Sequence, residues 1–378
     1  MSSPVKIVPI GPVVVTGGCG FIGSHLVDGI LASEPNCEVH VIDINTSRNC
    51  SIDPRVTYHT VDIAHASAVE AVISTARPRT IFHVACPDSM VTLDVSVFRR
   101  VNVDGTRNLL NAAEKVGTVL AFVNTSTSSV IHDNVSDLIN ADETLPVLHY
   151  PAQKRIYTLT KAEAEADILA ANRKHGDSSM LTVSLRPATA FGERDTICMG
   201  KIVATCRQGK GRFQIGPGQN QYDFIYISNL VDAHLLAAYA LLRAHGKPAL
   251  PLEARVDGQA LHITNDERIL FWEFQRLISD SVGMPVRSED IKIIPKWLAM
   301  FMALINEYST WIRSWGTEQS AVTREAVRLT TIERTLNGEK AKSLLGYRPK
   351  VGIREGIQRG GKWFVEEEKR TGGTKKTT

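Results

Sequence analysis

The sequence lacks the features of a secreted, nucleic-acid-binding or metal-binding protein. Its 43 basic and 40 acidic side chains leave a net charge of +3, which provides no broad positive surface for a nucleic-acid backbone. Its six cysteines form no CxxC pair and have no histidine cluster nearby, so neither a zinc site nor a disulfide framework is expected. The first 20 residues lack the pattern of a secretory signal. We therefore expect reduced thiols, no metal, no nucleic-acid partner and a chain that faces the cytosol.

What the sequence does contain is a regular alternation of two patterns. Short β-branched or apolar runs typical of buried strands occur at 13–16, 39–43, 56–61, 80–85, 119–124 and 181–185. Between them, 21–32, 67–76, 94–116 and 157–175 have helical character. Parallel strands need crossover connections, which are usually helices. The alternation therefore predicts an α/β fold with a Rossmann-type, doubly wound parallel sheet.

The alternation weakens after residue 187, which suggests how the chain is divided. We predict a nucleotide-binding Rossmann core at 1–190 and a mainly substrate-binding region at 191–350. A strand and a helix of the core are expected to return near 224–264. The end of the chain, 366–378, offers almost no apolar anchor and is predicted to be a disordered tail.

A glycine-rich turn follows the first predicted strand. Gly17, Gly20 and Gly23 have the spacing GxxGxxG between a strand and a helix, where glycine lets the backbone approach a pyrophosphate. Asp43 ends the second strand 20 residues after Gly23, and a carboxylate there accepts hydrogen bonds from an adenosine ribose diol. It would also repel a 2′-phosphate. The sequence therefore predicts NAD as the cofactor.

Two further groups of polar residues have the character of a catalytic site. Tyr157 and Lys161 are four residues apart, hence on one face of a helix, and a nearby ammonium group and nicotinamide cation would favour the tyrosinate. A row of hydroxyls, 125–129, follows the strand at 119–124, where one of them could bind a substrate oxygen. Either group alone is common by chance. Together with the glycine turn, and in this order, they indicate an oxidoreductase.

This order of motifs resembles the extended short-chain dehydrogenases, and within them the 3β-hydroxysteroid dehydrogenase family. The resemblance extends over about residues 11–350. The further segments that carry it are His83–Pro87, Asn102–Thr106, Leu185–Asp195, Asp223–His234 and His262–Glu267 followed by Phe271 and Trp272.

The resemblance implies a role for each matching residue. Tyr157 would be the acid/base, Lys161 its partner on the nicotinamide ribose, and Thr127 the hydroxyl that holds the reacting oxygen, with Ser126 as the alternative. Thr127 stands where the family has serine, a departure that keeps the hydroxyl. The cofactor-binding residues, besides Tyr157 and Lys161, would be Gly17, Cys19, Gly20, Phe21, Ile22, Gly23, Asp43, Asp62, Ile63, Ala85, Asn102 and Pro187. The substrate contacts, besides Thr127, would be Pro87, Phe191 and Arg194.

The resemblance also implies a reaction. The chain would oxidise the 3β-hydroxyl of a 4-carboxylated sterol or triterpenoid with NAD and release the C4 carboxylate as carbon dioxide. The alternatives are a 3β-hydroxysteroid dehydrogenase/isomerase or a ketoreductase acting on another polycyclic terpenoid. A nucleotide-sugar epimerase and a non-catalytic dinucleotide sensor fit less well, the latter because the Tyr/Lys pair is kept.

The segment 291–316 is unusually apolar. Its run from Trp297 to Ile305 has nine residues, whereas a bilayer-spanning helix needs about 20. One interpretation is a helix that lies in the membrane interface, and the other is an apolar lid over a substrate pocket. A homodimer is also expected, as is a location in the cytoplasm or on the cytoplasmic side of the endoplasmic reticulum.

Overall fold

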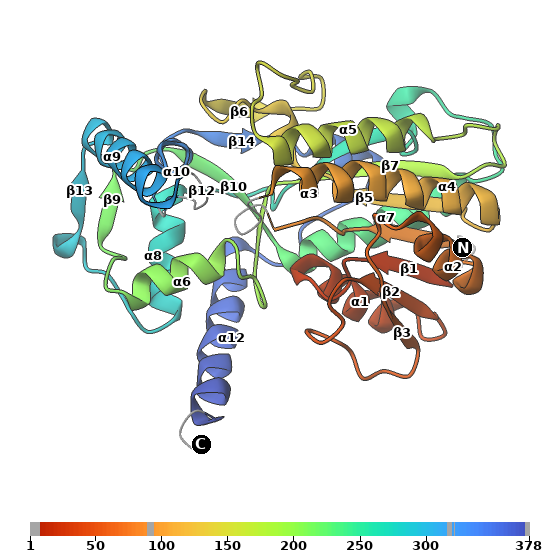
Figure 1. The fold of residues 1–378 in the computed structure, drawn as a ribbon, viewed down its shortest axis with the longest axis horizontal. Helices are drawn as coiled ribbons and strands as arrows, with labels where there is room; N and C mark the ends of the chain where they lie inside the picture. Colours follow the sequence, from red (N-terminus) through yellow and green to blue (C-terminus); the bar gives the residue numbers. More distant parts are fainter. Residues whose placement is uncertain (1–7, 89–93, 316–319, 321, 375–378) are drawn as a thin grey trace, which may run out of the picture.

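The computed structural model describes residues 8–88, 94–315, 320 and 322–374. Its larger sheet has seven parallel strands in the order β11-β7-β5-β4-β1-β2-β3 (Figure 1). The strands are β1 (Val13–Thr16), β2 (Val39–Asp43), β3 (Val56–Thr60), β4 (Thr80–His83), β5 (Ala121–Thr125), β7 (Leu181–Pro187) and β11 (Gln259–Ile263). This topology is the predicted doubly wound sheet.

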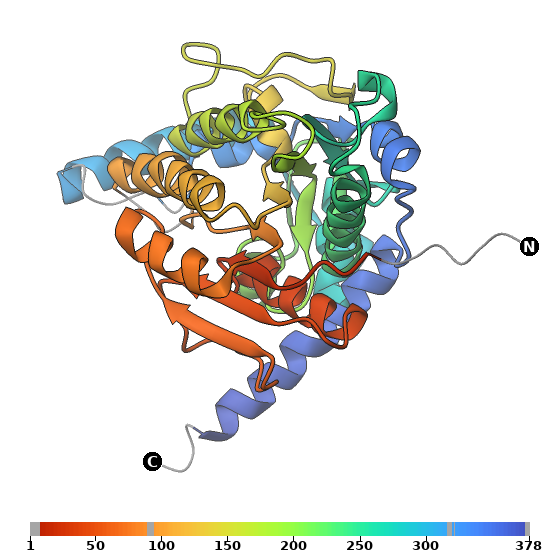
Figure 2. The same cartoon turned by 90° about the vertical axis from the view of Figure 1, so that its right-hand side faces the viewer.

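Helices cover both faces of this sheet (Figures 1 and 2). On one face α1 (Phe21–Ser33) packs against α7 (Ile227–Ala244), and on the other α4 (Thr106–Val116) packs between α2 (Ala66–Ala76) and α5 (Ile156–Ala170). Strands β1, β4, β5, β7 and β11 are consequently buried along their whole length, which explains their continuous apolar runs. The returning helix and strand expected near 224–264 are α7 and β11.

The helical stretch expected at 94–116 is divided into three parts. It begins with α3 (Val95–Arg99), continues as a π-helical segment, Arg100–Gly105, and ends as α4. Such wide turns are frequent at functional sites. The interruption sets the orientation of Asn102, which lies within it.

A second, mixed sheet lies at the other end of the molecule (left in Figure 1). Its strand order is β12-β10-β14-β6, with β8 paired to β10. The strands are β6 (Leu138–Ala141), β8 (Thr189–Phe191), β10 (Gln221–Tyr226), β12 (Arg268–Leu270) and β14 (Arg334–Leu336). The strands β9 (Phe213–Ile215) and β13 (Lys292–Ile294) pair separately. The helices of this region are α6 (Met199–Arg207), α8 (Phe271–Ser281), α9 (Lys296–Ser314), α10 (Arg324–Leu329), α11 (Glu339–Leu345) and α12 (Ile353–Thr374).

The end of the chain differs from the prediction. Residues 366–374, expected to be disordered, form the last turns of α12, which extends away from the body of the molecule (Figure 2). The first part of α12 supplies the apolar anchor that the tail composition does not show, because Ile353 and Ile357 are buried in the main core. Residues 375–378 lie outside the described residues.

Candidate functional site

The glycine turn between β1 and α1 has the geometry of a dinucleotide-binding loop. Gly17 has φ +68°, and a Cβ atom on it would lie 2.7 Å from the Cα of Ala85. A Cβ atom on Gly23 would lie 2.1 Å from the carbonyl oxygen of Gly17. Helix α1 then begins at Phe21 with no side-chain cap at Gly20, so its first N–H groups are available to an anion. The loop therefore fits a pyrophosphate.

Asp43 lies where an adenosine ribose would bind beside this loop. Its carboxylate, at the end of β2, accepts hydrogen bonds from the backbone N–H groups of Cys19 and Asn45, each at 3.0 Å. These contacts hold it next to the glycine turn. The structure thus brings together Gly17, Cys19, Gly20, Phe21, Gly23 and Asp43 as predicted, and Ile22 lies in the first turn of α1.

The other predicted cofactor residues lie at the carboxyl edge of the large sheet or beside it. Ala85 follows β4 and contacts Gly17, Pro187 ends β7, and Ile63 packs against Gly105. Asp62 accepts the N–H of Ala64 at 2.9 Å, whereas the cap position of α2 is His65. Asp62 therefore closes a turn before α2 and is not the cap of that helix.

A buried histidine, His83, links two elements at this edge of the sheet. Its role is not evident from the sequence. The Nδ1 atom of His83 lies 2.8 Å from the Thr16 hydroxyl, and its Nε2 lies 2.9 Å from the Thr106 hydroxyl. Thr106 donates to the carbonyl oxygen of Asn102 at 2.6 Å, so its oxygen must accept from Nε2–H. Burial, and then the charge of Lys161, lower the pKa of His83 to about 3, so the ring stays neutral. His83 thereby joins β1 to the first residue of α4.

The predicted catalytic residues converge where β5 meets α5. The hydroxyl of Thr127 faces the phenol of Tyr157 and lowers its pKa, and the ammonium group of Lys161 donates to the carbonyl oxygen of Thr125 at 2.6 Å. The hydroxyl of Ser126 is buried and has no hydrogen-bond partner among the described residues. The geometry therefore favours Thr127 over Ser126 as the hydroxyl that acts with Tyr157.

Asn102 supports this constellation from the π-helical segment. Its side-chain amide donates to the Thr160 hydroxyl at 3.0 Å, which couples the segment to α5. Its Oδ1 atom is buried without a partner in the described part of the chain, so it can still accept a hydrogen bond.

Burial dominates the electrostatics of the pair. It raises the pKa of Tyr157, and the nearby thiol of Cys86 adds to this effect. The hydroxyl of Thr127 and the positive charges of Arg155 and Arg334 lower that pKa in part. Burial also lowers the pKa of Lys161. Without a cofactor Tyr157 is consequently a neutral phenol. A tyrosinate needs further positive charge nearby, which the nicotinamide cation expected from the sequence would supply.

Two arginines near Tyr157 were not identified from the sequence. Arg334, in β14, donates to the hydroxyls of Ser129 at 2.8 Å and Ser128 at 3.2 Å, directly after Thr127. The Arg155 guanidinium lies 5.5 Å from the centre of the Tyr157 ring. No local motif marks Arg334, because the pairing of β14 with β6 and β10 brings it to the site. These arginines make the surroundings of the phenol suitable for an anionic substrate group.

The predicted substrate contacts have different outcomes. Pro87 is half-buried in the loop after β4, at the edge of the site. The prediction for Phe191 is wrong, because its side chain is 0% exposed and packs against Phe224 and Phe274 in the core. The Arg194 guanidinium lies 2.8 Å from Asp28 of α1, to which it is ion-paired. Its role toward the substrate stays a prediction.

Within the described residues, no group of three or more His, Cys, Asp and Glu side chains could hold a metal ion. None of the helices described is both long and apolar enough to cross a bilayer.

The fold and the site define a class of protein, the extended short-chain dehydrogenases, by the doubly wound sheet, the glycine loop and the Tyr/Lys pair on α5. A sequence model of the 3-beta hydroxysteroid dehydrogenase/isomerase family matches residues 14–293. The chain therefore belongs to this family.

Relatives with named activities align with nearly the whole chain. A "3beta-hydroxysteroid-dehydrogenase/decarboxylase isoform 1" of Arabidopsis thaliana is 37% identical over 92% of this chain and 78% of its own length. A decarboxylating sterol-4-alpha-carboxylate 3-dehydrogenase of Saccharomyces cerevisiae is 32% identical over 94% of this chain and 99% of its own length. The Homo sapiens protein of that name is 32% identical over 91% of this chain and 86% of its own length.

Solved structures support the same fold. A Thermus thermophilus UDP-glucose 4-epimerase in complex with NAD is 25% identical, with a TM-score of 0.66, over 93% of this chain and 98% of its own. A UDP-glucose 4-epimerase of Thermotoga maritima is 22% identical, with a TM-score of 0.68, over 94% of this chain and 99% of its own.

Proposed function

We propose that the protein oxidises the 3β-hydroxyl of a 4-carboxylated sterol or triterpenoid with NAD, and that the resulting 3-ketone loses the C4 carboxylate as carbon dioxide. The single observation that carries this proposal is the joint placement of Tyr157 and the Thr127 hydroxyl beside a dinucleotide loop and two arginines. The names of the plant, yeast and human relatives support the same reaction.

The binding of NAD would use groups that are already in place. The loop from Gly17 to Gly23 and the first turn of α1 would hold the pyrophosphate, and Asp43 the adenosine ribose. Lys161, fixed to the carbonyl of Thr125, would hold the nicotinamide ribose. When bound, NAD accepts the hydride from C3 of the substrate.

The chemistry of the substrate would then depend on the hydroxyl pair. Thr127 orients the 3-hydroxyl, and Tyr157, once deprotonated, takes its proton; such general base catalysis contributes about 10²–10⁴-fold. The resulting β-keto acid loses carbon dioxide as the C–C bond electrons move into an enolate. The protonated Tyr157 and Thr127 are placed to donate hydrogen bonds to the enolate oxygen.

Arg334 is the group best placed to bind the C4 carboxylate. It approaches the site from β14, it bonds the hydroxyls next to Thr127, and its charge acts on Tyr157. Arg194 is less suited, because its guanidinium already has a carboxylate partner in Asp28. An arginine binds carboxylate in a geometry that a neutral substrate cannot use.

The test is to incubate the protein with NAD and matched 3β-alcohols that carry a 4-carboxyl or a 4-methyl group. We expect NADH formation and release of carbon dioxide from the carboxylated substrate, and Tyr157→Phe should abolish both while NAD binding is retained. Oxidation without loss of carbon dioxide would favour the dehydrogenase/isomerase alternative. Near wild-type turnover of the Tyr157→Phe variant would contradict the assignment.

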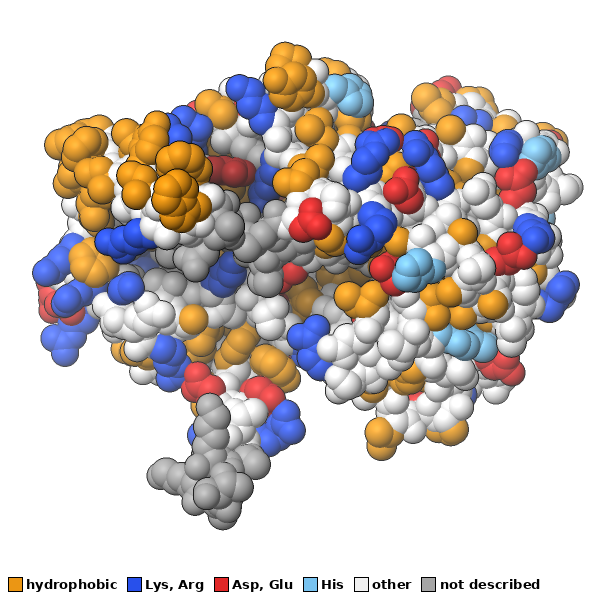
Figure 3. All heavy atoms as spheres, in the orientation of Figure 1, with side chains coloured by type: hydrophobic (Ala, Val, Ile, Leu, Met, Phe, Trp, Pro, Cys, Tyr) orange, Lys and Arg blue, Asp and Glu red, His pale blue; other side chains and the backbone are white. Residues whose placement is uncertain are grey.

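Helix α9 supports a second part of the proposal, peripheral contact with a membrane. Of its 19 residues only Ala299 and Ala303 are buried, against Val327. Its large apolar side chains instead face outward, as the orange cluster at the upper left of Figure 3 shows. Those exposed are Trp297, Phe301, Met302, Ile305, Tyr308, Trp311 and Ile312, followed by Trp315. A lid would present such side chains to its pocket, so we favour the interfacial helix.

The charges around α9 are consistent with an anionic lipid surface. Lys292, Lys296 and Arg313 are exposed near its ends. Its one carboxylate, Glu307, lies 2.7 Å from Arg324 and is neutralised by it. Three tryptophans and a tyrosine are typical of the interfacial zone. We therefore propose that the protein binds the cytoplasmic face of the endoplasmic reticulum through 291–315; the expected homodimer stays a prediction.

A further inference from the structure

Two cysteines that are distant in the sequence meet at the glycine loop. The Sγ atoms of Cys19 and Cys50 are 3.9 Å apart, although the two residues are 31 positions apart in the sequence. Cys19 is 3% exposed and lies within the turn between Gly17 and Gly20, whereas Cys50 is exposed. The pair therefore has one thiol that solvent reaches and one that belongs to the dinucleotide-binding loop.

We propose that Cys19 and Cys50 are a thiol-modification site that takes a low-molecular-weight disulfide, such as oxidised glutathione, and that the disulfide formed between them weakens dinucleotide binding. The second half of this inference rests on the proposed binding of NAD to the glycine loop. The first half, the formation of the disulfide, does not.

The loop that carries Cys50 is held close to Cys19, and its outer side faces solvent. The Asn49 side-chain amide donates to the carbonyl oxygen of Cys19 at 3.1 Å, which places the next residue beside Cys19. Ile44 and Ile52 on either side of this loop are 72% and 102% exposed, so nothing packs over them. A disulfide needs an S–S distance of about 2.05 Å. The required approach of about 2 Å can therefore come from the exposed loop, while Cys19 stays with the core.

The reaction balances with the disulfide as the only oxidant. The exposed thiolate of Cys50 attacks one sulfur of oxidised glutathione, forms a mixed disulfide and releases one glutathione thiolate. The Cys19 thiolate then attacks the Cys50 sulfur and releases the second. Two protein thiols are oxidised and one glutathione disulfide is reduced to two thiols.

The order of the two steps follows from the surroundings of each thiol. Burial, and then the charge of Asp43, raise the pKa of Cys19 to about 12, so little of it is thiolate at neutral pH. The second step is therefore the slow one and should accelerate as the pH rises.

The consequence for the cofactor arises from the backbone of Cys19. Its N–H bonds the Asp43 carboxylate at 3.0 Å, so Cys19 lies between the predicted pyrophosphate and ribose contacts. A covalent bond to Cys50 would draw the 44–52 loop toward Cys19 and fix that loop over the adenosine side. Binding of NAD should weaken, and bound NAD should in turn slow the modification.

The experiment uses the full chain, first reduced and then treated with oxidised glutathione at about pH 8. Peptide mapping identifies the linked cysteines, and titration with NAD measures affinity before and after treatment. We expect a Cys19–Cys50 link, a loss of NAD affinity of about tenfold, and full recovery with dithiothreitol. Cys50→Ser should bind NAD normally and be insensitive, while Cys206→Ser, which changes a buried thiol elsewhere, should respond as the wild type does.

The outcomes separate this inference from the proposed function. No Cys19–Cys50 link, or a link that leaves NAD affinity unchanged, would overturn it. A response of equal size in Cys50→Ser would assign the effect to another thiol and would also overturn it. If the reduced chain bound no NAD, the proposed function would fail and the regulatory half with it, but mapping would still decide whether the disulfide forms.

Discussion

Tyr157 is the residue whose chemistry depends most on its neighbours. Burial opposes its ionisation, and the groups that favour it are one hydroxyl, Thr127, and two positive charges, Arg155 and Arg334. The spacing of Tyr157 and Lys161 places both on one face of a helix, and a row of hydroxyls, 125–129, follows a predicted strand. Within that row Thr127 is singled out only by the family resemblance. The sequence does not place Arg334, which is separated from Tyr157 by the second sheet and by most of the substrate-binding region.

The first prediction concerns Thr127. Its hydroxyl lowers the pKa of Tyr157, so Thr127→Val should raise that pKa, and the rise of kcat/KM with pH should move upward by about one unit. Thr127→Ser keeps the hydroxyl and should keep the wild-type profile. The pH dependence of NADH formation measures both. An unchanged profile in Thr127→Val would show that this hydroxyl does not act on the base.

The second prediction concerns Arg334. Arg334→Met should reduce kcat/KM for a 4-carboxylated substrate by roughly 30- to 150-fold, or about 2–3 kcal/mol, because the carboxylate loses its ion pair. A 3β-alcohol without the carboxyl group should be affected much less. Arg194→Met is the matched control, since Arg194 is paired with Asp28. A larger loss in the control than in Arg334→Met would return the carboxylate site to Arg194.

At the scale of elements, the strands that the sequence predicts are those that helices cover on both faces of the sheet. The strands of the large sheet are covered on both sides, so their apolar runs are continuous and easily recognised. The short strands β6 and β14 have mixed burial and no such run, and they were not predicted. The assignment of Phe191 to the substrate failed for a related reason. A motif gives the position of a side chain along the chain and not the side on which it packs.

Helix α9 gives the third prediction. If its exposed apolar face inserts into a membrane interface, the protein should float with vesicles that contain anionic lipid, and changing Trp297, Phe301 and Trp311 together to serine should abolish flotation. These side chains are 71%, 55% and 62% exposed, so the fold should be unaffected. The matched control changes Tyr150 and Leu252 to serine, because both side chains are exposed and neither belongs to α9. Equal recovery of both variants with vesicles would exclude α9 as the contact.

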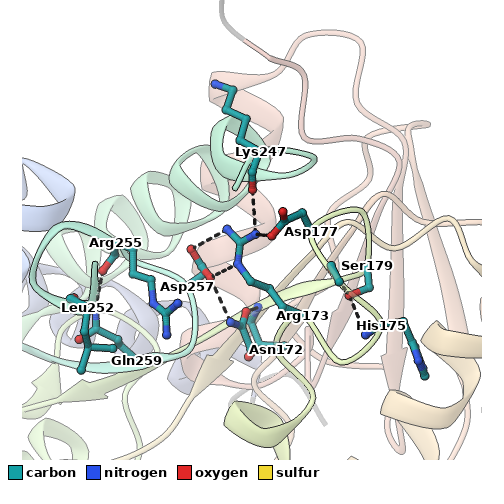
Figure 4. A network of polar contacts seen from close by, with 12 residues as sticks. Asn172, Arg173, His175, Asp177, Ser179, Lys247, Leu252, Arg255, Asp257 and Gln259 are labelled. Atoms are coloured by element: carbon teal, nitrogen blue, oxygen red, sulfur yellow. Dashed lines mark hydrogen bonds and ion pairs between the residues drawn. The ribbon is translucent and has the colours of Figure 1, made fainter. Parts of the chain in front are cut away.

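At the scale of the whole molecule, polar side chains join the end of α5 to the segment before β11. Arg173 donates to Asp257 at 2.7 Å and to the carbonyl of Lys247 at 2.9 Å, and Asn172 donates to Asp257 at 3.0 Å (Figure 4). Asp257 is 1% exposed. Burial would raise its pKa, but Arg173 and Asn172 outweigh this effect and lower it. The carboxylate is therefore charged, buried and dependent on these donors.

The fourth prediction is that Arg173→Met destabilises the fold by about 3–5 kcal/mol, because it leaves a buried charge without its main partner. Lys174→Met, which changes the neighbouring but exposed pair with Glu114, should cost less than about 1 kcal/mol. Urea unfolding at neutral pH measures both.

The contribution of the Arg173–Asp257 pair to stability depends on pH. Since the folded-state pKa of Asp257 lies below its unfolded value, its contribution is complete above that unfolded value, about 3.9. It is lost as the pH falls through the folded-state pKa. The stability difference between the wild type and Arg173→Met should shrink in this acidic range and stay constant near neutrality.

The pairing of β14 within the second sheet has one more consequence. Thr127 belongs to the end of the large sheet and Arg334 to the other sheet, so the two groups that would bind the hydroxyl and the carboxylate are carried by separate frameworks. Their separation is set by how these frameworks pack and by the hydrogen bonds from Arg334 to Ser128 and Ser129. The hydroxyl-binding and carboxylate-binding groups thus lie at a fixed distance from each other. This distance would select rigid ring systems whose hydroxyl and carboxylate oxygens have the matching spacing. A relative with the same catalytic side chains could prefer a different ring substituent if its two sheets packed at a different distance from each other.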